Sequence, residues 1–316
     1  MTMADSFVHI PVLPEEVVKH ISNGNFRRWI DGTLGGGGHA SLLLKANPEA
    51  ELLGIDRDDH ALSHAREVLA FGGKRVHTRK GRYSEMTTFA QEEGWDQVDA
   101  ILLDIGVSSA QIDNGSRGFS FRMDGPLDMR MDSSSPLTAS RILNHYPAEE
   151  LERIFREYGE LDGGSARRLS MAILERRELE PFSGTLDFAG LCEKVLRKPR
   201  RNAPPVATLP FQALRIAVNG ELDELREGLE QAVDLLAPGG RLCVISFHSL
   251  EDRIVKNFFR DMAVNCKCPP GLPICTCGWT PKLKIVTKHP EVAGERELAA
   301  NPRAACAKLR VAVKVS

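Results

Sequence analysis

Three aspartates are the residues of this chain best placed to bind a polar ligand. Asp31, Asp56 and Asp104 each end a predicted strand, over residues 26–31, 52–56 and 98–104. The last of these strands is a continuous apolar run, as is typical of a strand buried on both faces of a parallel sheet. Because the carboxyl ends of parallel strands meet at one edge of the sheet, we expect the three carboxylates to lie around one ligand site.

A glycine-rich turn follows the first of these aspartates. The run Gly35-Gly36-Gly37-Gly38 leads into a predicted helix at residues 40–44. Glycines let the main chain pass close to a ligand because they carry no side chain that would obstruct it. Asp56 lies about 20 residues further on, where an acid accepts hydrogen bonds from a ribose diol. Together these features predict a site for ribose and adenosine.

Two classes of cofactor compete for this site. A nicotinamide dinucleotide would use Asp31 and Asp56 equally well but gives no role to Asp104. S-adenosylmethionine gives all three a role: Asp31 at the amino-acid end, Asp56 on the ribose, and Asp104 near the adenine and the reacting methyl. The pattern therefore favours a methyltransferase over a nicotinamide-dependent oxidoreductase. A non-catalytic RNA-binding factor is a third alternative, which the three intact aspartates disfavour.

The composition is that of an ordinary globular protein. The chain has 316 residues, of which 42% are hydrophobic and 27% charged, and its formal net charge is −2. The net charge of the whole chain therefore does not indicate a polyanionic partner, and any basic surface must be local. No apolar run has the length of a signal peptide or a membrane span, and the seven cysteines, an odd number, indicate reduced thiols. We expect a cytoplasmic protein with no membrane partner.

The order of the predicted elements indicates an α/β fold, a doubly wound parallel sheet interrupted by a helical insert. Further strands are predicted at residues 75–79 and 241–247. Between them, helical apolar stripes occur at residues 151–158, 169–173 and 186–196. We therefore expect a discontinuous sheet domain, residues 1–112 and 206–316, and an inserted helical substrate-recognition domain, residues 113–205.

Long motifs occur along nearly the whole chain. They are DGTLGGGGH at 31–39, ILLDIGVSSAQ at 101–111, RGFSFRMDGPLDMRMD at 117–132, FQALRI at 211–216, SFHSLEDR at 246–253 and NPR at 301–303. In these motifs the chain resembles the RsmH (MraW) family. The resemblance implies an S-adenosylmethionine-dependent methyltransferase that acts on N4 of a cytosine in the decoding region of 16S ribosomal RNA, within the small ribosomal subunit. It also implies a class I (Rossmann-like) methyltransferase sheet with an inserted all-helical domain.

The resemblance also assigns cofactor-binding residues. Carried over position by position, they are Gly37, Gly38, His39, Asp56, Tyr83, Asp104 and Gln111. Tyr83 stands where the family usually has Phe, which keeps an aromatic ring to lie against the adenine; it could instead simply cap the sheet. Leu209-Pro210 replaces the family's usual Arg-Thr, which removes an arginine expected to contact RNA or a domain interface.

The residues around Asp104 limit the chemistry. The amino nitrogen of cytosine is a poor nucleophile because its lone pair is delocalised into the ring, so a group that accepts its N–H hydrogens would assist attack on a methyl group. Asp104, or the main-chain carbonyls after it, is our candidate acceptor, and a role for Asp104 as a cofactor ligand alone is equally open. Covalent attack at C5 would require a cysteine. Residues 104–111 contain none.

His248 is a second candidate catalytic or nucleotide-clamping residue. It lies between Ser246 and Ser249 at the end of the predicted strand 241–247, followed by Arg253. The alternative is a hydrogen-bonded turn between strand and helix, with Ser249 as the cap of a helix that starts near Leu250.

Local basic clusters are expected to bind RNA phosphates. One consists of Lys194, Arg197, Lys198, Arg200 and Arg201, and the other of Lys74, Arg75, Arg79, Lys80 and Arg82. The segment 117–132, rich in Phe, Met and Arg, is predicted either to face RNA or to dock the insert onto the sheet domain.

Four cysteines in the C-terminal part form two Cys-x-Cys pairs. They are Cys266, Cys268, Cys275 and Cys277. These thiols are candidates for a zinc site, although the one-residue spacer is shorter than the two to four residues typical of zinc knuckles. Unliganded surface thiols and redox-active pairs are the alternatives, and no metal is expected at the catalytic site.

Overall fold

The computed structural model describes residues 11–22, 26–197, 204–268 and 276–315. The chain divides into two compact units. The first, here called the sheet unit, comprises Met1–Gly106 and Leu222–Ser316; the second, the helical unit, comprises Val107–Glu221. The domain limits expected from the sequence, 1–112 with 206–316 and 113–205, stay a prediction.

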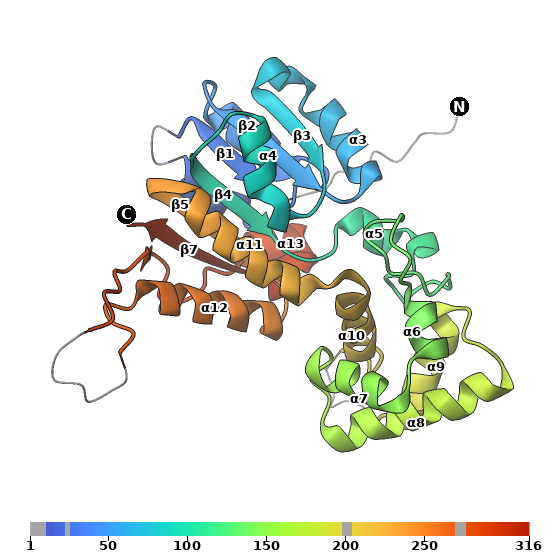
Figure 1. Ribbon diagram of the computed structural model, residues 1–316. Coiled ribbons are helices and arrows are strands. Elements are labelled where there is room, and N and C mark those ends of the chain that lie inside the picture. Colours follow the sequence, from blue (N-terminus) through green and yellow to red (C-terminus); the bar gives the residue numbers. More distant parts are fainter. Residues whose placement is uncertain (1–10, 23–25, 198–203, 269–275, 316) are drawn as a thin grey trace, which may run out of the picture. The chain divides into compact units, whose positions relative to one another are not determined.

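The sheet unit is built on seven strands (Figure 1). They are β1 (Arg28–Asp31), β2 (Glu51–Asp56), β3 (Val76–Lys80), β4 (Val98–Asp104), β5 (Leu236–Ser246), β6 (Leu283–Ile285) and β7 (Lys308–Lys314). Their order is β3-β2-β1-β4-β5-β7-β6, with parallel pairing from β3 to β5. The strand order reverses between β1 and β4, which is where open α/β sheets bind their ligands. The expected α/β sheet of the Rossmann type is confirmed.

The strand register places the three aspartates together. Asp31 is paired with Gly54 on β2 and with Leu102 on β4. Asp56 and Asp104 each lie two residues beyond these partners, at the ends of their strands. Since side chains alternate between the faces of a sheet with a period of two, all three carboxylates point to the same face.

The antiparallel edge of the sheet was not predicted. Strand β7 pairs antiparallel with β5 and with β6. Its sequence, KLRVAVK, has no continuous apolar run because charged residues interrupt it. Two of these charged residues, Arg310 and Lys314, are nevertheless buried. Arg310 is bonded to Asp252 at 2.7 Å, and the Lys314 ammonium donates to the Val233 carbonyl at 2.7 Å. These partners make burial of the two charges acceptable, and they come from parts of the chain far away in sequence.

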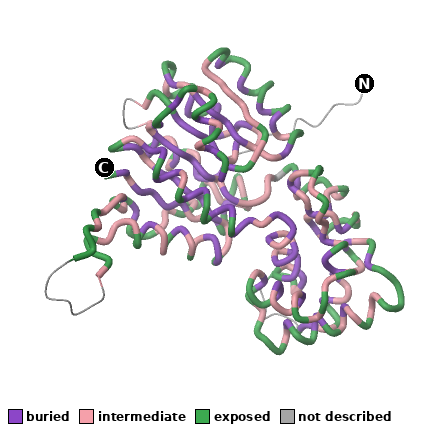
Figure 2. Tube along the Cα trace, viewed as in Figure 1, coloured by how far each residue is buried: buried purple, intermediate pink, exposed green. Residues whose placement is uncertain are grey.

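Helices cover both faces of the sheet. One apolar core packs α1 (Pro14–Ile21), α2 (Gly38–Ala46) and α3 (Asp59–Val68) against one face; the other packs α4 (Met86–Glu92), α11 (Glu221–Leu235) and α12 (Ser249–Ala263) against the opposite face. The short helix α13 (Glu295–Ala300) precedes β7. The strands are accordingly the most continuously buried part of this unit (Figure 2). None of the helices within the described ranges is long and apolar enough to cross a membrane.

The helical unit has an aromatic core of its own. Its helices are α5 (Ser109–Asp113), α6 (Ala139–His145), α7 (Ala148–Glu157), α8 (Gly163–Leu179), α9 (Thr185–Val195) and α10 (Thr208–Asn219). Phe188 on α9 is fully buried, and its ring lies 5.4–6.3 Å from the rings of Phe155, Phe182 and Phe211. Four aromatic rings from different segments therefore hold this unit together.

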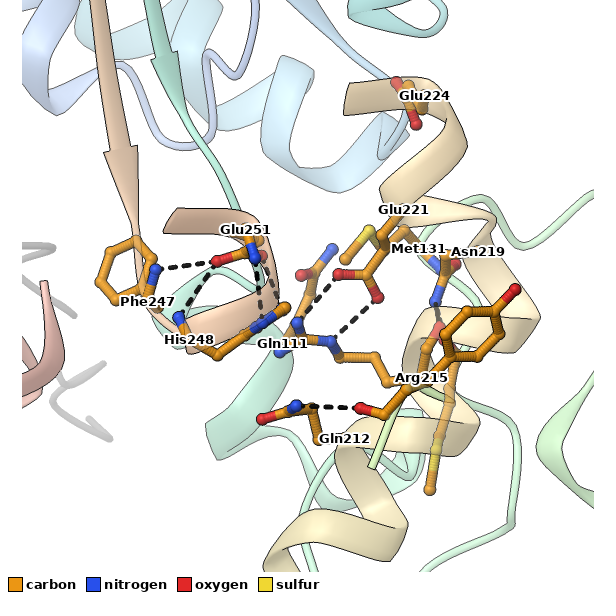
Figure 3. A network of polar contacts seen from close by, with 12 residues as sticks. Gln111, Met131, Gln212, Arg215, Asn219, Glu221, Glu224, Phe247, His248 and Glu251 are labelled. Atoms are coloured by element: carbon orange, nitrogen blue, oxygen red, sulfur yellow. Dashed lines mark hydrogen bonds and ion pairs between the residues drawn. The ribbon is translucent and has the colours of Figure 1, made fainter. Parts of the chain in front are cut away.

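The segment 117–132 packs into the core of the helical unit. Leu127 and Met129 are buried there, and the Asn219 side chain accepts from the Met131 N–H and donates to the Met129 carbonyl, both at 2.8 Å (Figure 3). Its apolar residues thus have a structural role within their own unit, which the sequence did not reveal because Asn219 lies far along the chain.

Phe188→Ala is expected to lower the free energy of unfolding by about 3–5 kcal/mol, because it leaves a cavity among three aromatic rings. Urea denaturation followed by circular dichroism measures the change. Leu179→Ala in α8 is the control, since Leu179 is 87% exposed and its truncation should cost less than about 0.5 kcal/mol. Equal midpoints for the two variants would contradict a core role for Phe188.

Candidate active site

The turn after β1 is fixed by main-chain hydrogen bonds to both neighbouring strands. The N–H of Gly32 donates to the Leu102 carbonyl of β4, and that of Leu34 to the Ile55 carbonyl of β2, each at 2.9 Å. Gly35 and Gly37 have φ angles of +52° and +81°, which residues with a side chain rarely adopt. The glycines therefore allow the chain to turn sharply after β1, at the edge where the strand order reverses.

Asp56 fixes the glycine turn through its side chain. One carboxylate oxygen accepts from the Gly35 N–H and the other from the Asp58 N–H, both at 2.8 Å. Burial raises the pKa of Asp56, and these two N–H donors oppose the rise. Asp56 therefore positions the turn, and its remaining lone pairs are the ones a ribose diol would use.

Asp31 is a buried carboxylate at the end of the central strand. Burial raises its pKa to about 7, and the charges of Asp104 and Asp56 act in the same direction. His39 and the Thr33 N–H, which donates to Asp31 at 3.2 Å, lower it. Because its pKa is close to neutral pH, this buried acid can readily ionise when a cation approaches it.

His39 and Asp104 carry buried polar atoms that lack a partner. The main chain of Asp104 is fixed by its N–H bond to the Thr33 hydroxyl at 2.6 Å. Asp104 Oδ1 and both ring nitrogens of His39 have no hydrogen-bond partner among the residues that the structure describes. The His39 Nε2 and Asp104 Oδ2 atoms are 3.6 Å apart, which is too long for a hydrogen bond. Since unpaired buried polar atoms are costly, these atoms point to a polar ligand.

Tyr83 is held from two sides. It is 6% exposed, and a methyl group added to Gly32 or to Gly228 of α11 would collide with it. Its main-chain N–H donates to Glu224 at 3.2 Å, and Glu224 also forms an ion pair with Arg57, the residue after Asp56. The Cβ of Tyr83 therefore lies against Gly32 in the turn after β1, and its ring lies against Gly228. Sequence reasoning missed the Arg57–Glu224 pair, since nothing local links the two residues.

Gln111 is the predicted site residue that lies in the helical unit. It closes a capping box on α5: its side chain accepts from the Ser108 N–H at 3.0 Å, and its own N–H donates to the Ser108 hydroxyl at 3.3 Å. The other predicted cofactor residues, Gly37, Gly38, His39, Asp56, Tyr83 and Asp104, all belong to the sheet unit.

His248 is the N-cap of α12, a position that the sequence analysis had offered to Ser249. The helix begins at Ser249, and the His248 ring accepts from the Glu251 N–H at 3.4 Å (Figure 3). Glu251 is fully buried and accepts from the main-chain N–H groups of Phe247 and His248 at 2.8 and 3.2 Å. The turn is therefore a closed capping box, and Glu251, not a serine, organises it.

The basic clusters differ in their surroundings. Arg79 forms ion pairs with Glu92 and Glu93, and Lys80 with Asp59, so acids neutralise much of this cluster. In the other cluster, Lys194 and Arg197 are exposed, whereas Lys198, Arg200 and Arg201 lie outside the described residues. Of the four clustered cysteines, Cys266, Cys268 and Cys277 lie together, and Cys275 is outside the described residues.

The residues at this edge of the sheet suit S-adenosylmethionine. Three carboxylates, of which Asp31 is buried and Asp56 and Asp104 are partly buried, favour a cationic ligand, and S-adenosylmethionine carries a sulfonium and an ammonium group. Its ribose hydroxyls can donate to Asp56, and the unpartnered oxygen of Asp104 offers a further acceptor. The glycine turn leaves room for close approach of the ligand to the main chain. Fold and site together define an α/β enzyme that binds an adenosine-containing cofactor.

Comparison with known proteins identifies the family. Residues 6–315 match the MraW methylase family. A protein named Ribosomal RNA small subunit methyltransferase H from Carboxydothermus hydrogenoformans is 47% identical over 314 residues, which cover 98% of this chain and 99% of that protein. Proteins of the same name from Geobacter sulfurreducens and Syntrophotalea carbinolica are 49% and 50% identical, over 98% and 96% of this chain and 100% and 97% of theirs.

The chain therefore belongs to the MraW methylase family, as its motifs had indicated. It is a methyltransferase, and its cofactor is S-adenosylmethionine. The nicotinamide-dependent oxidoreductase and the non-catalytic binding factor are set aside.

Affinity for S-adenosylhomocysteine is expected to rise with pH. With a pKa of about 7, Asp31 is mostly protonated near pH 6 and mostly ionised near pH 8. Only the ionised form attracts the ammonium group, so the dissociation constant should fall about tenfold over this range. Isothermal titration calorimetry at several pH values measures it. In Asp31→Asn, which keeps His39, Asp56 and Asp104, the affinity should be weaker and nearly independent of pH; the same pH dependence in both proteins would rule out Asp31 as the source.

Proposed function

We propose that this protein transfers a methyl group from S-adenosylmethionine to the ribosomal RNA of the small subunit, at N4 of a cytosine in the decoding region. The observation that carries the proposal is the near-complete match to proteins named for methylation of small-subunit ribosomal RNA. The choice of an exocyclic amino group is supported by the acceptor chemistry at Asp104. The assembled small subunit in the cytoplasm is the proposed setting of the reaction.

Asp104 is the proposed acceptor for the target amino group. When bound, S-adenosylmethionine supplies an electrophilic methyl group. Attack on it requires that the amino nitrogen lose a proton and that its lone pair leave conjugation with the ring. The unpartnered Asp104 Oδ1 can accept an N–H of that amino group, orient its lone pair and take up the proton. The hydroxyl of Thr33 holds the main chain of Asp104 in place while this happens.

Residues outside this edge are proposed to bind the RNA. The His248 ring, 9% exposed and fixed by the α12 capping box, is a proposed contact of the target nucleotide. The basic residues from Lys194 to Arg201 are proposed to bind phosphates. Leu209 and Pro210, which begin α10 with Thr208, replace the arginine expected from the family. Any RNA contact made by that arginine in relatives must come from another residue here.

Methyl mapping in cells tests the function. Ribosomal RNA from a strain lacking the protein should lose one methylated cytidine, which nucleoside mass spectrometry identifies as the N4 or the C5 isomer. Purified protein should restore it on small subunits from that strain. Loss of a methyl group at C5, at ribose or at another base would overturn the proposed specificity.

Asp104→Asn is expected to lower kcat by at least about 100-fold, because a neutral amide can accept a hydrogen bond but cannot take up the amino proton. Single-turnover methylation of unmethylated small subunits measures this, with the affinity for S-adenosylhomocysteine measured in parallel. Asp99→Asn is the matched control: Asp99 lies at the other end of β4, where it accepts from the Arg27 and Arg28 N–H groups. A loss of cofactor affinity with unchanged kcat would show that Asp104 is a cofactor ligand alone.

A further inference from the structure

The connection between α12 and β6 gathers three cysteine thiols. The Sγ atoms of Cys266, Cys268 and Cys277 all lie within 4.8 Å of one another. Those of Cys266 and Cys277 are 3.8 Å apart, far beyond the length of about 2.05 Å of a disulfide bond. Cys275 lies outside the described residues, so the three described thiols define the cluster.

The spacing of these sulfur atoms fits a metal ion. Zinc binds thiolate sulfur at about 2.3 Å with tetrahedral geometry, which separates neighbouring sulfurs by about 3.8 Å. The Cys266–Cys277 distance equals this value. The one-residue spacer between Cys266 and Cys268 does not keep their sulfur atoms apart, since the two lie within 4.8 Å of each other. The short spacer therefore allows both sulfur atoms to bind the same metal ion.

Main-chain N–H groups are directed at the sulfur atoms. The Cys268 N–H donates to Cys266 at 3.3 Å, the Lys267 N–H to Cys277 at 3.4 Å, and the Thr276 N–H to Cys268 at 3.4 Å. Each sulfur therefore accepts at least one main-chain hydrogen bond from the residues that the structure describes. Such bonds favour the ionised thiolate, which is the form that binds metal, and they orient the ligands around it.

Neighbouring residues stabilise the cluster. The Lys267 ammonium lies 3.3 Å from the centre of the Trp279 ring, and the Trp279 indole N–H donates to the Val264 carbonyl at 2.9 Å. The bond from Trp279 to Val264 joins the chain after the cysteines to the chain before them, and the Lys267 contact adds a link from between Cys266 and Cys268. The positive charge of Lys267, between two of the thiols in sequence, also offsets part of the charge of a thiolate site.

Two other cysteines show how a thiol without such a role is placed. Cys192 and Cys243 are fully buried in the two units, and burial raises the pKa of Cys243 to about 12 and that of Cys192 even further. They remain protonated and act as small apolar side chains. The clustered thiols differ because they are partly or fully exposed and accept main-chain N–H groups.

We propose that Cys266, Cys268 and Cys277 bind a zinc ion that fixes the connection between α12 and β6. Soft thiolate ligands select zinc over magnesium and calcium, which prefer oxygen. The ion stabilises this connection and takes no part in methyl transfer.

Metal analysis of the full-length protein tests the proposal. Protein purified without chelators from cells grown with added zinc should contain about one zinc ion per chain. Inductively coupled plasma mass spectrometry measures this content. Replacing the ion with Co²⁺ should give the thiolate-to-cobalt charge-transfer band and the visible bands of tetrahedral cobalt. Cys266→Ser and Cys277→Ser should each lose most of the zinc. Cys306→Ser is the matched control, since Cys306 is also exposed but does not belong to the cluster, and it should keep the zinc.

Two results would overturn the proposal. One is a zinc content near zero in the wild-type protein together with no cobalt charge-transfer band after titration of the reduced protein with Co²⁺. The other is an intact mass two hydrogens lighter than the reduced chain, with a peptide that joins Cys266 to Cys277, because the cluster is then a redox pair. Circular dichroism of each serine variant verifies that it is folded, so that a lost metal reflects a lost ligand.

Discussion

The structure depends on three acids at the carboxyl ends of three adjacent strands, of which Asp31 is buried and Asp56 and Asp104 are partly buried. Carboxylates lose hydration when they are buried, and here main-chain N–H groups replace part of it: Gly35 and Asp58 donate to Asp56, and Thr33 donates to Asp31. The same hydrogen bonds shape the glycine turn. The carboxylates, whose burial is unfavourable without the cofactor, therefore also hold the main chain of the cofactor site in place.

This compromise leaves some groups unsatisfied. Asp104 Oδ1 and the ring nitrogens of His39 are buried without hydrogen-bond partners among the described residues, and the pKa of Asp31 is raised to about 7. Each condition is unfavourable in the protein alone and is relieved by a cationic ligand rich in hydrogen-bond donors. A preorganised site of this kind gives up stability in the unliganded protein for affinity and orientation in the complex.

Much of the sheet could be predicted from the sequence because its signals are local. Asp31, Asp56 and Asp104 follow apolar runs, and a run with an acid at its end identifies both the strand and the edge to which it points. The fold class, the five parallel strands and the family were therefore within reach. The register that sets all three acids on one face follows from the pairing of Asp31 with Gly54 and Leu102, which the sequence does not state.

What the sequence could not give were features created by distant partners. Strand β7 was missed because Arg310 and Lys314 interrupt its apolar pattern. Both can be buried because they donate hydrogen bonds to Asp252 and to the Val233 carbonyl. The Arg57–Glu224 pair beside Tyr83 was missed for the same reason. At α12, a serine was the obvious cap, yet His248 took the position because buried Glu251 binds the main chain before the helix.

The interruption of the sheet has a consequence for biosynthesis. Strand β4 must pair with β5, but the whole helical unit, Val107–Glu221, is translated between them. At about 5–20 residues per second, the outer edge of β4 waits on the order of ten seconds for its neighbour. An apolar strand with open hydrogen-bonding groups invites wrong partners during that time. The nascent chain must therefore keep half a sheet from aggregating while the ribosome completes an independent helical body.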